Sequence, residues 1–194
     1  MSLIKDGTRH HTYADYLTWP DDKTGELVDG VAYIREPSPP ARLHQGIVGG
    51  LYCQVAEALE DRASHVYMAP FEVRLPRSTE PDDEVDTVVQ PDVLIVCDLH
   101  KLDARGMRGA PDWLAEVASP STARYDQVVK LSAYERAGVR EVWLTDPADR
   151  SLTIYHLAAG RYGRPAILGL RGKTQLSAVD GVTIDWDRML AKLE

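Results

Sequence analysis

The sequence predicts a mixed α/β fold, an α+β arrangement in which a mixed sheet carries flanking helices and an N-terminal hairpin. The main observation is residues 110–146, which read as strand, turn, helix and strand. Residues 112–118 and 141–145 are apolar enough for buried strands, and residues 125–137 have the spacing of an amphipathic helix. Gly138 stands where helices commonly end. We therefore expect a sheet that is covered by helices.

The N-terminal third predicts two helices and a hairpin. Residues 12–19 form a short amphipathic pattern that Thr12 can cap. Residues 26–36 read as a hairpin whose two-residue turn is Asp29-Gly30. A long helix is expected at residues 42–62. Its buried face consists of His44, Val48, Leu51, Val55 and Leu59.

The middle of the chain predicts strands that prolines interrupt. Residues 66–75 read as a strand with a break at Pro70, and residues 76–86 as an acidic loop. Residues 87–96 are the most continuous apolar strand, yet they contain Gln90-Pro91-Asp92. Proline has no backbone N–H to donate to a neighbouring strand. A proline and an acid are therefore unexpected inside a strand that otherwise looks buried. Such conflicts often mark function, although a bulge with a solvent-facing Asp92 is an alternative.

The remaining segments complete one expected domain, residues 1–194. Residues 97–109 read as a polar loop and residues 160–163 as a turn. Strands are expected at residues 151–157, 165–170 and 182–186, and a short terminal helix at residues 186–193.

Composition limits the classes of function. The net charge is −8, which argues against a broad nonspecific nucleic-acid surface but leaves a local basic groove open. No apolar run is long enough to cross a membrane and no signal peptide is visible, so we expect a cytoplasmic protein. Cys53 and Cys97 lie in apolar runs and are expected to be buried hydrophobes, without the paired spacing of a zinc site.

The helix at residues 125–137 places two ionisable groups on its apolar face. Asp126 and Lys130 share the inward stripe of Val129, Ala133 and Ala137. Inward charges are costly unless they are paired or bind something, and Glu116 on the preceding strand is the obvious partner. A functional site and a purely structural ion pair both remain open at this point.

Asp92, Glu116 and Lys130 together suggest phosphodiester chemistry. Two carboxylates on neighbouring strands offer the hard oxygen ligands that Mg²⁺ or Mn²⁺ prefers. A lysine beside such an ion can orient water and offset charge on phosphorus. By itself the trio is a weak signal, because α/β proteins contain many acids and lysines.

Ordered motifs over most of the chain resemble the Uma2 family of predicted endonucleases, once catalogued as a domain of unknown function. The matching residues are Glu26 to Gly30, Pro37-Ser38-Pro39, His44-Gln45, Pro91-Asp92-Val93, Gly109 to Asp112, Glu116 to Thr122, Asp126, Lys130, Tyr134, Ala137-Gly138-Val139, Glu141-Val142-Trp143 and Asp146-Pro147. The segment Glu116 to Thr122, with its downstream acid and lysine, is the most specific of these.

The resemblance implies a restriction-endonuclease-like core of the PD-(D/E)xK superfamily. The first acid of that pattern is Asp92 and the second is Glu116, and these two would hold Mg²⁺ or Mn²⁺. The lysine normally follows two residues after the second acid, but Ala118 stands there in this chain. Uma2-like chains carry the lysine on the next helix, which implies Lys130. Its independently expected inward position supports the transfer.

Six further residues are secondary candidates for the same site. Asp126 would hold the lysine or a metal-bound water, and Tyr134 would orient the lysine unless it is simply core. His44 would reach the site from the long helix, unless it is an ordinary buried histidine. The other candidates are Ser119 and Ser121, as donors to Glu116 or phosphate, and Gln90, beside the metal.

We therefore predict a metal-dependent endonuclease that hydrolyses DNA. The main alternative is a catalytically silent nuclease fold that binds nucleic acid or a partner protein. A hydrolase of small phosphoesters is a third class, which would need a closed pocket. A homodimer is a further hypothesis, since strands after Asp146 can leave an edge available for pairing.

Overall fold

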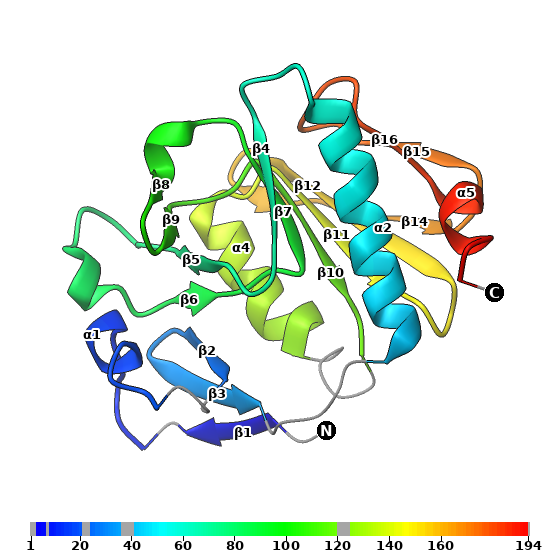
Figure 1. Ribbon diagram of the computed structural model, residues 1–194. Coiled ribbons are helices and arrows are strands. Elements are labelled where there is room, and N and C mark those ends of the chain that lie inside the picture. Colours follow the sequence, from blue (N-terminus) through cyan, green and yellow to red (C-terminus); the bar gives the residue numbers. More distant parts are fainter. Residues whose placement is uncertain (1–2, 7, 21–23, 36–40, 120–124, 194) are drawn as a thin grey trace.

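The computed structural model describes residues 3–6, 8–20, 24–35, 41–119 and 125–193, and within them two seven-stranded sheets form the framework (Figure 1). The first sheet has the order β1-β3-β2-β6-β5-β9-β8. Its strands are β1 (Leu3–Asp6), β2 (Gly25–Val28), β3 (Val31–Arg35), β5 (Glu72–Arg74), β6 (Val88–Val89), β8 (Leu102–Asp103) and β9 (Gly106–Arg108).

The second sheet has the order β13-β12-β11-β10-β7-β4, and β14 also pairs with β12. Its strands are β4 (His65–Met68), β7 (Val93–Val96), β10 (Trp113–Val117), β11 (Glu141–Asp146), β12 (Ser151–Ala158), β13 (Arg161–Tyr162) and β14 (Ala166–Gly169). Strands β10 and β11 are parallel, while the other pairings within this sheet are antiparallel. A separate two-stranded ribbon pairs β15 (Lys173–Gln175) with β16 (Thr183–Asp185).

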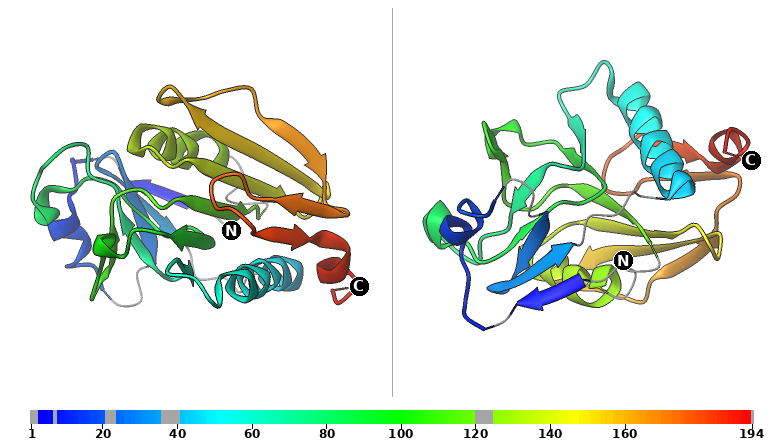
Figure 2. Two further views of the ribbon diagram at one scale, coloured as in Figure 1. Left: turned by 90° about the horizontal axis from the view of Figure 1, so that it is seen from above. Right: turned by 60° about the horizontal axis from the view of Figure 1, so that its bottom comes forward.

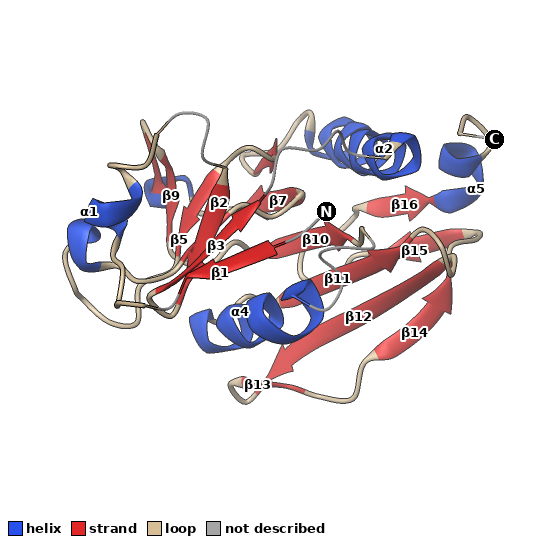
Figure 3. Ribbon diagram, turned by 90° about the horizontal axis from the view of Figure 1, so that it is seen from below, coloured by secondary structure: helices blue, strands red, loops and turns tan. Residues whose placement is uncertain are grey.

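Helices lie on both faces of the second sheet. The α-helices are α1 (Tyr13–Tyr16), α2 (Arg42–Leu59), α4 (Leu131–Ala137) and α5 (Trp186–Leu190). Short 3₁₀ turns occur at η1 (Asp82–Glu84) and η2 (Leu99–Lys101), and a π-helical segment, η3 (Asp126–Lys130), leads into α4. Helix α2 packs on one face, against β4, β7 and β10, and helix α4 lies on the other face, against β10 and β11, as Figures 2 and 3 show from different sides.

Two hydrophobic cores follow from this layering. The first lies between α2, the second sheet and the C-terminal ribbon with α5, and it contains Trp113, Trp143 and Trp186. The second joins α4 to residues of both sheets, such as Val73 and Leu114. The side chains of β10 therefore alternate between the two cores, as expected for a strand that is buried on both faces.

The prolines in the apolar middle of the chain mark the points where it changes sheets. Strand β4 belongs to the second sheet and β5 to the first, with Pro70 between them; β6 belongs to the first sheet and β7 to the second, with Pro91 between them. The two crossings are adjacent, since the Ala69 amide donates to the Asp92 carbonyl at 3.1 Å. The expected interruptions are therefore confirmed, and their cause is a change of sheet.

Most of the elements predicted from sequence are present. The mixed α+β class, the hairpin at Asp29-Gly30, the long helix and the strand–turn–helix–strand unit are confirmed. Gly138 ends α4 in a left-handed conformation with φ of 89°. The capping box at Thr12 is also present, although α1 is shorter than expected.

Some predictions were wrong because very short strands leave no periodic signal in a sequence. The expected loop at residues 97–109 contains β8 and β9, and the expected turn at residues 160–163 contains β13. Strand β15 was not predicted at all. Each of these strands has only two or three residues, so tertiary pairing alone defines it.

The cysteines are a second correction. Cys53 is exposed on α2 and Cys97 is half-buried, so neither is the fully buried hydrophobe that its apolar neighbours suggested. Cys53 lies between Leu51 and Val55, which both face the first core, and this spacing turns its own side chain outward.

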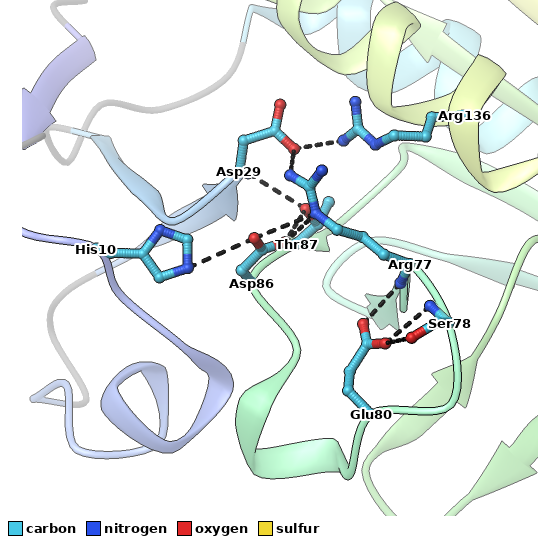
Figure 4. Close-up of polar contacts among 8 residues, drawn as sticks. All are labelled: His10, Asp29, Arg77, Ser78, Glu80, Asp86, Thr87 and Arg136. Carbon is cyan, nitrogen blue, oxygen red and sulfur yellow. Dashed lines mark hydrogen bonds and ion pairs between the residues drawn. The ribbon is translucent and has the colours of Figure 1, made fainter.

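An ion-pair network ties the turn of the N-terminal hairpin to the rest of the molecule (Figure 4). Asp29 and Gly30 adopt φ values of 53° and 73°, as a tight hairpin turn requires. The Asp29 carboxylate pairs with Arg136 of α4 and lies 2.7 Å from Arg77, which also contacts Asp86 at 3.3 Å. Each pair is partly exposed and individually weak, but together they link β2–β3 to α4.

Within the described residues, no helix is both long and apolar enough to cross a bilayer.

We predict that the two thiols react at very different rates in the folded protein. Cys53 is exposed, whereas burial raises the pKa of the Cys97 thiol and so lowers its thiolate fraction. Ellman's reagent near pH 7.5 should label one thiol quickly, and Cys53→Ser should remove that fast phase. Equal rates for both thiols would contradict the burial assigned to Cys97.

Candidate active site

Glu116 is directed into the second core by the alternation of β10. Trp113, Ala115 and Val117 belong to the first core, so Leu114 and Glu116 face α4. Glu116 is 3% exposed although it carries a carboxylate. Its partners must therefore come from the elements that pack on this face.

Segment η3 and helix α4 supply those partners. The Lys130 ammonium lies 2.6 Å from Glu116 Oε1 and 3.8 Å from Asp126 Oδ1, and the Tyr134 hydroxyl donates to Glu116 Oε1 at 2.5 Å. Lys130 is fully buried, with 0% exposure. The inward orientation that sequence spacing predicted for Asp126 and Lys130 is confirmed.

The π-helical turn of η3 was not predicted. The Leu131 amide donates to the Asp126 carbonyl five residues earlier, which is the π pattern. The wider turn places Asp126 and Lys130, four residues apart, on the same buried side. π-Turns of this kind occur frequently at functional sites.

Glu26 is a member of this cluster that the sequence reasoning missed. It lies on β2 with 1% exposure, and its Oε1 atom is 2.8 Å from the Lys130 ammonium. The same oxygen accepts the backbone N–H of Gln90 at 2.6 Å. The available signal was an acid inside a short strand that is otherwise apolar.

Asp92 lies beside Glu116, at the edge of the second sheet. Its Oδ2 atom accepts the backbone N–H of Val117 at 2.7 Å, and the Nε2 atom of His44 is 3.5 Å from the same oxygen. The sheet crossing at Pro91 thus turns Asp92 toward the end of β10, where helix α2 begins. His44 reaches Asp92 from the first turn of that helix.

The electrostatics of the cluster are dominated by burial and by an excess of negative charge. Burial raises the pKa of Glu116 to about 8, because it disfavours the charged carboxylate. The Lys130 ammonium acts in the opposite direction, and the carboxylates of Asp126, Asp92 and Glu26 raise the pKa further. One ammonium cannot neutralise this many acids, so the neighbouring carboxylates reinforce the effect of burial on Glu116.

Burial also raises the pKa of the Tyr134 hydroxyl, and the nearby Glu116 carboxylate adds to that effect. Tyr134 therefore stays protonated and remains a hydrogen-bond donor to Glu116.

The other secondary candidates for the site are Gln90, Ser119 and Ser121. The Gln90 side chain donates to the Tyr16 hydroxyl at 3.0 Å, and the contact of Gln90 with Glu26 of the cluster is made by its backbone amide. Ser119 is half-buried just after β10. Ser121 lies outside the described residues.

A cavity of about 120 Å³ lies next to Glu116. Its described lining residues are Glu116, Ala118, Asp126, Gln127, Leu144, Thr145, Asp146, Asp149, Ser151 and Thr153. Four of these are acids and none is a lysine or arginine. The cavity therefore suits hydrogen-bond donors or cations better than it suits phosphate.

The donor set near Asp92 and Glu116 fits a hard divalent ion. Among the described residues there is no cluster of three or more histidine, cysteine or acidic groups arranged to hold a metal. Two carboxylates alone are nevertheless a common anchor for Mg²⁺, which keeps several waters and takes further oxygens from substrate phosphates. Water and substrate would have to complete such a shell here.

Structural comparison shows that the fold is shared with a solved structure. A crystal structure described as "a putative nuclease belonging to DUF820" from Anabaena variabilis ATCC 29413 superposes with a TM-score of 0.72. The match covers 94% of this chain and 99% of that one at 15% sequence identity. At this identity the likeness shows a shared fold.

The sequence itself identifies the family. Residues 13–191 match the Uma2 family, which is described as "Putative restriction endonuclease", and the chain therefore belongs to Uma2. None of the proteins with curated descriptions matches the sequence significantly. The matched range includes Glu26, Asp92, Glu116 and Lys130.

We predict that Glu116 makes the stability of the protein fall with rising pH. Its pKa is higher in the folded state than the ordinary value of 4.5, so between about pH 4.5 and pH 8 the folded protein binds more protons than the unfolded chain. The free energy of unfolding should decrease across this window by up to about 1.4 kcal/mol per pH unit.

Glu116→Gln provides the comparison, because glutamine does not titrate. Urea unfolding of both proteins at several pH values should give a steeper decline for the wild type. Parallel curves would show that Glu116 is already ionised throughout this range.

Proposed function

We propose that the protein is a metal-dependent endonuclease that hydrolyses phosphodiester bonds of DNA. The observation that carries the proposal is the meeting of two acids and a lysine from separate elements. Glu116 contacts Lys130 at 2.6 Å, while Asp92 accepts the amide of Val117, the next residue after Glu116. Membership of Uma2 supports the same class of activity.

Asp92 and Glu116 are the residues that would hold the ion, with Mg²⁺ or Mn²⁺ as the expected metal. When bound, such an ion polarises a phosphoryl oxygen and lowers the pKa of a coordinated water. His44 lies close enough to Asp92 to orient its carboxylate.

Lys130 would supply positive charge at the reacting phosphate or orient the attacking water. Its place at the end of η3, just before α4, would compensate for Ala118, which stands where a strand lysine is usual in this superfamily. Asp126 and Tyr134 lie one helical turn to either side of Lys130 and would hold the ammonium and the Glu116 carboxylate in place.

The cavity beside Glu116 argues against the small-phosphoester alternative. An enclosed phosphate site needs cations or backbone donors, but the described lining of this cavity is acidic. We therefore favour a polymer substrate whose phosphate approaches Glu116 from the side of Asp92, where the ion would bind.

One observation favours a silent nuclease fold as the second candidate. Lys130 is completely buried and contacts both Glu116 and Glu26, so it would have to be released in part before it could act on a phosphate. In a silent protein the same cluster would serve as a buried ion pair that specifies the packing of α4.

We predict that Mn²⁺ binds the wild type and that Asp92→Asn abolishes the binding measured by calorimetry. Asparagine retains an acceptor for the Val117 amide and removes the ligand charge. Asp112→Asn is the matched control, because Asp112 also accepts one backbone amide, that of Cys97, at 2.7 Å and its side chain is likewise 15% exposed. Equal Mn²⁺ affinity in the wild type and Asp92→Asn would refute the proposed metal site.

We predict that Lys130→Met retains Mn²⁺ binding but loses DNA cleavage by about 100-fold or more. Methionine fills the space of the lysine stem but lacks its charge. Loss of the cation leaves the buried acids without their partner and should lower the free energy of unfolding by about 3 kcal/mol. Thermal unfolding must therefore be measured beside cleavage. Undiminished cleavage by the folded variant would assign the role to another residue, with His44 the first candidate.

A further inference from the structure

We propose that Glu26 is the positioning residue of this site, and that it holds the Lys130 ammonium in place when Glu116 turns to a metal ion. This inference rests on the proposed nuclease function. It gives a role to a residue of the N-terminal hairpin that neither the strand motif nor the helix carrying the lysine would indicate.

The contacts of Glu26 are those expected of a residue that fixes the position of the Lys130 ammonium. Its Oε1 atom lies 2.8 Å from Lys130 Nζ, and both side chains are almost completely buried. At this depth an ammonium–carboxylate contact is much stronger than at the surface, and an uncompensated charge is costly. Glu26 therefore strongly restricts where the Lys130 ammonium can lie.

A second carboxylate is needed because Glu116 cannot bind both the Lys130 ammonium and a divalent ion equally well. In the structure Lys130 lies between Glu116 and Glu26 at similar distances of 2.6 and 2.8 Å. A divalent ion at Glu116 would compete with the ammonium for that carboxylate. Glu26 would then keep the long lysine side chain close to the reacting phosphate instead of letting it sample other rotamers.

Glu26 also connects the lysine to the segment that carries the first acid. The oxygen that contacts Lys130 also accepts the Gln90 amide at 2.6 Å, two residues before Asp92. One carboxylate oxygen thus joins the helix of the lysine to the crossing between the sheets. The pairing of Asp29 with Arg77 and Arg136, at the turn after β2, holds this hairpin against α4 (Figure 4).

Another buried glutamate shows what a purely structural acid looks like in this protein. Glu141 is also 1% exposed, but its carboxylate accepts hydrogen bonds from the Trp143 indole N–H and from the amides of Ser177 and Ala178. These are neutral donors that belong to the first core and its flanking loop. Glu141 is therefore a matched control for replacing a buried glutamate by glutamine.

The test observes the Lys130 ammonium directly by NMR, on full-length protein that carries ¹⁵N-labelled lysine. The chain has six lysines, and Lys130→Met identifies the signal of residue 130. We expect a slowly exchanging ammonium signal in the wild type, because the group is buried and bonded to carboxylates. In Glu26→Gln this signal should shift, and its protons should exchange about tenfold faster. In Glu141→Gln it should stay as in the wild type.

An unchanged Lys130 signal in Glu26→Gln would overturn the inference, whatever happens to activity. Glu26→Asp serves as a second variant if the glutamine variant does not fold. It keeps the charge but shortens the side chain by one methylene, so the contact with Lys130 should lengthen and the same signal should shift.

Kinetics separate this inference from the proposed function. If the wild type cleaves DNA, Glu26→Gln should lower kcat by about tenfold with little change in KM, whereas Glu141→Gln should leave both unchanged. If the wild type does not cleave any DNA tested, the proposed function fails, and the NMR signal still decides whether Glu26 positions Lys130.

Discussion

The contact of one buried ammonium with carboxylates from two different sheets is the interaction on which the rest of this site depends. Lys130 meets Glu116 from the second sheet and Glu26 from the first, and Asp126 lies one turn away on its own helix. Burying such charges is expensive unless each is paired, so the packing of α4 between the sheets and the pairing of these residues require one another. Burial raises the pKa of Glu116, and the excess negative charge of the neighbouring carboxylates adds to that effect.

The two sheet crossings explain how distant segments supply the site. The chain leaves the second sheet near Pro70 and returns to it near Pro91, and the two crossings are joined through Ala69 and the Asp92 carbonyl. A proline is tolerated there because a chain that changes sheets has no ladder donor to lose. The return places Asp92 against the amide of Val117. The local conflict between an apolar strand and a Pro-Asp pair is thus resolved by topology.

The position of the lysine on a helix has chemical consequences. A lysine on the strand beside Glu116 would share the fixed geometry of the sheet, whereas Lys130 projects from a π-turn on a long, flexible stem. Additional partners are then needed to define where the ammonium lies. Glu26, Asp126 and Tyr134 surround the Lys130–Glu116 pair. The site therefore draws on more of the chain than two acids and a lysine.

Local patterning determined much of this protein from sequence alone. The hairpin, the two main helices, the strands of the second sheet other than β13, and the inward face of Asp126 and Lys130 follow from spacing, turn residues and caps, which act over a few neighbours. Strands β8, β9, β13 and β15, the exposed side of Cys53, the π-turn and the place of Glu26 were decided by tertiary structure. Strands of two or three residues carry no period, and no local rule says which buried acid will meet which lysine. Glu26 and Lys130 are separated by about a hundred residues of sequence and meet only because the two sheets pack against the same helix.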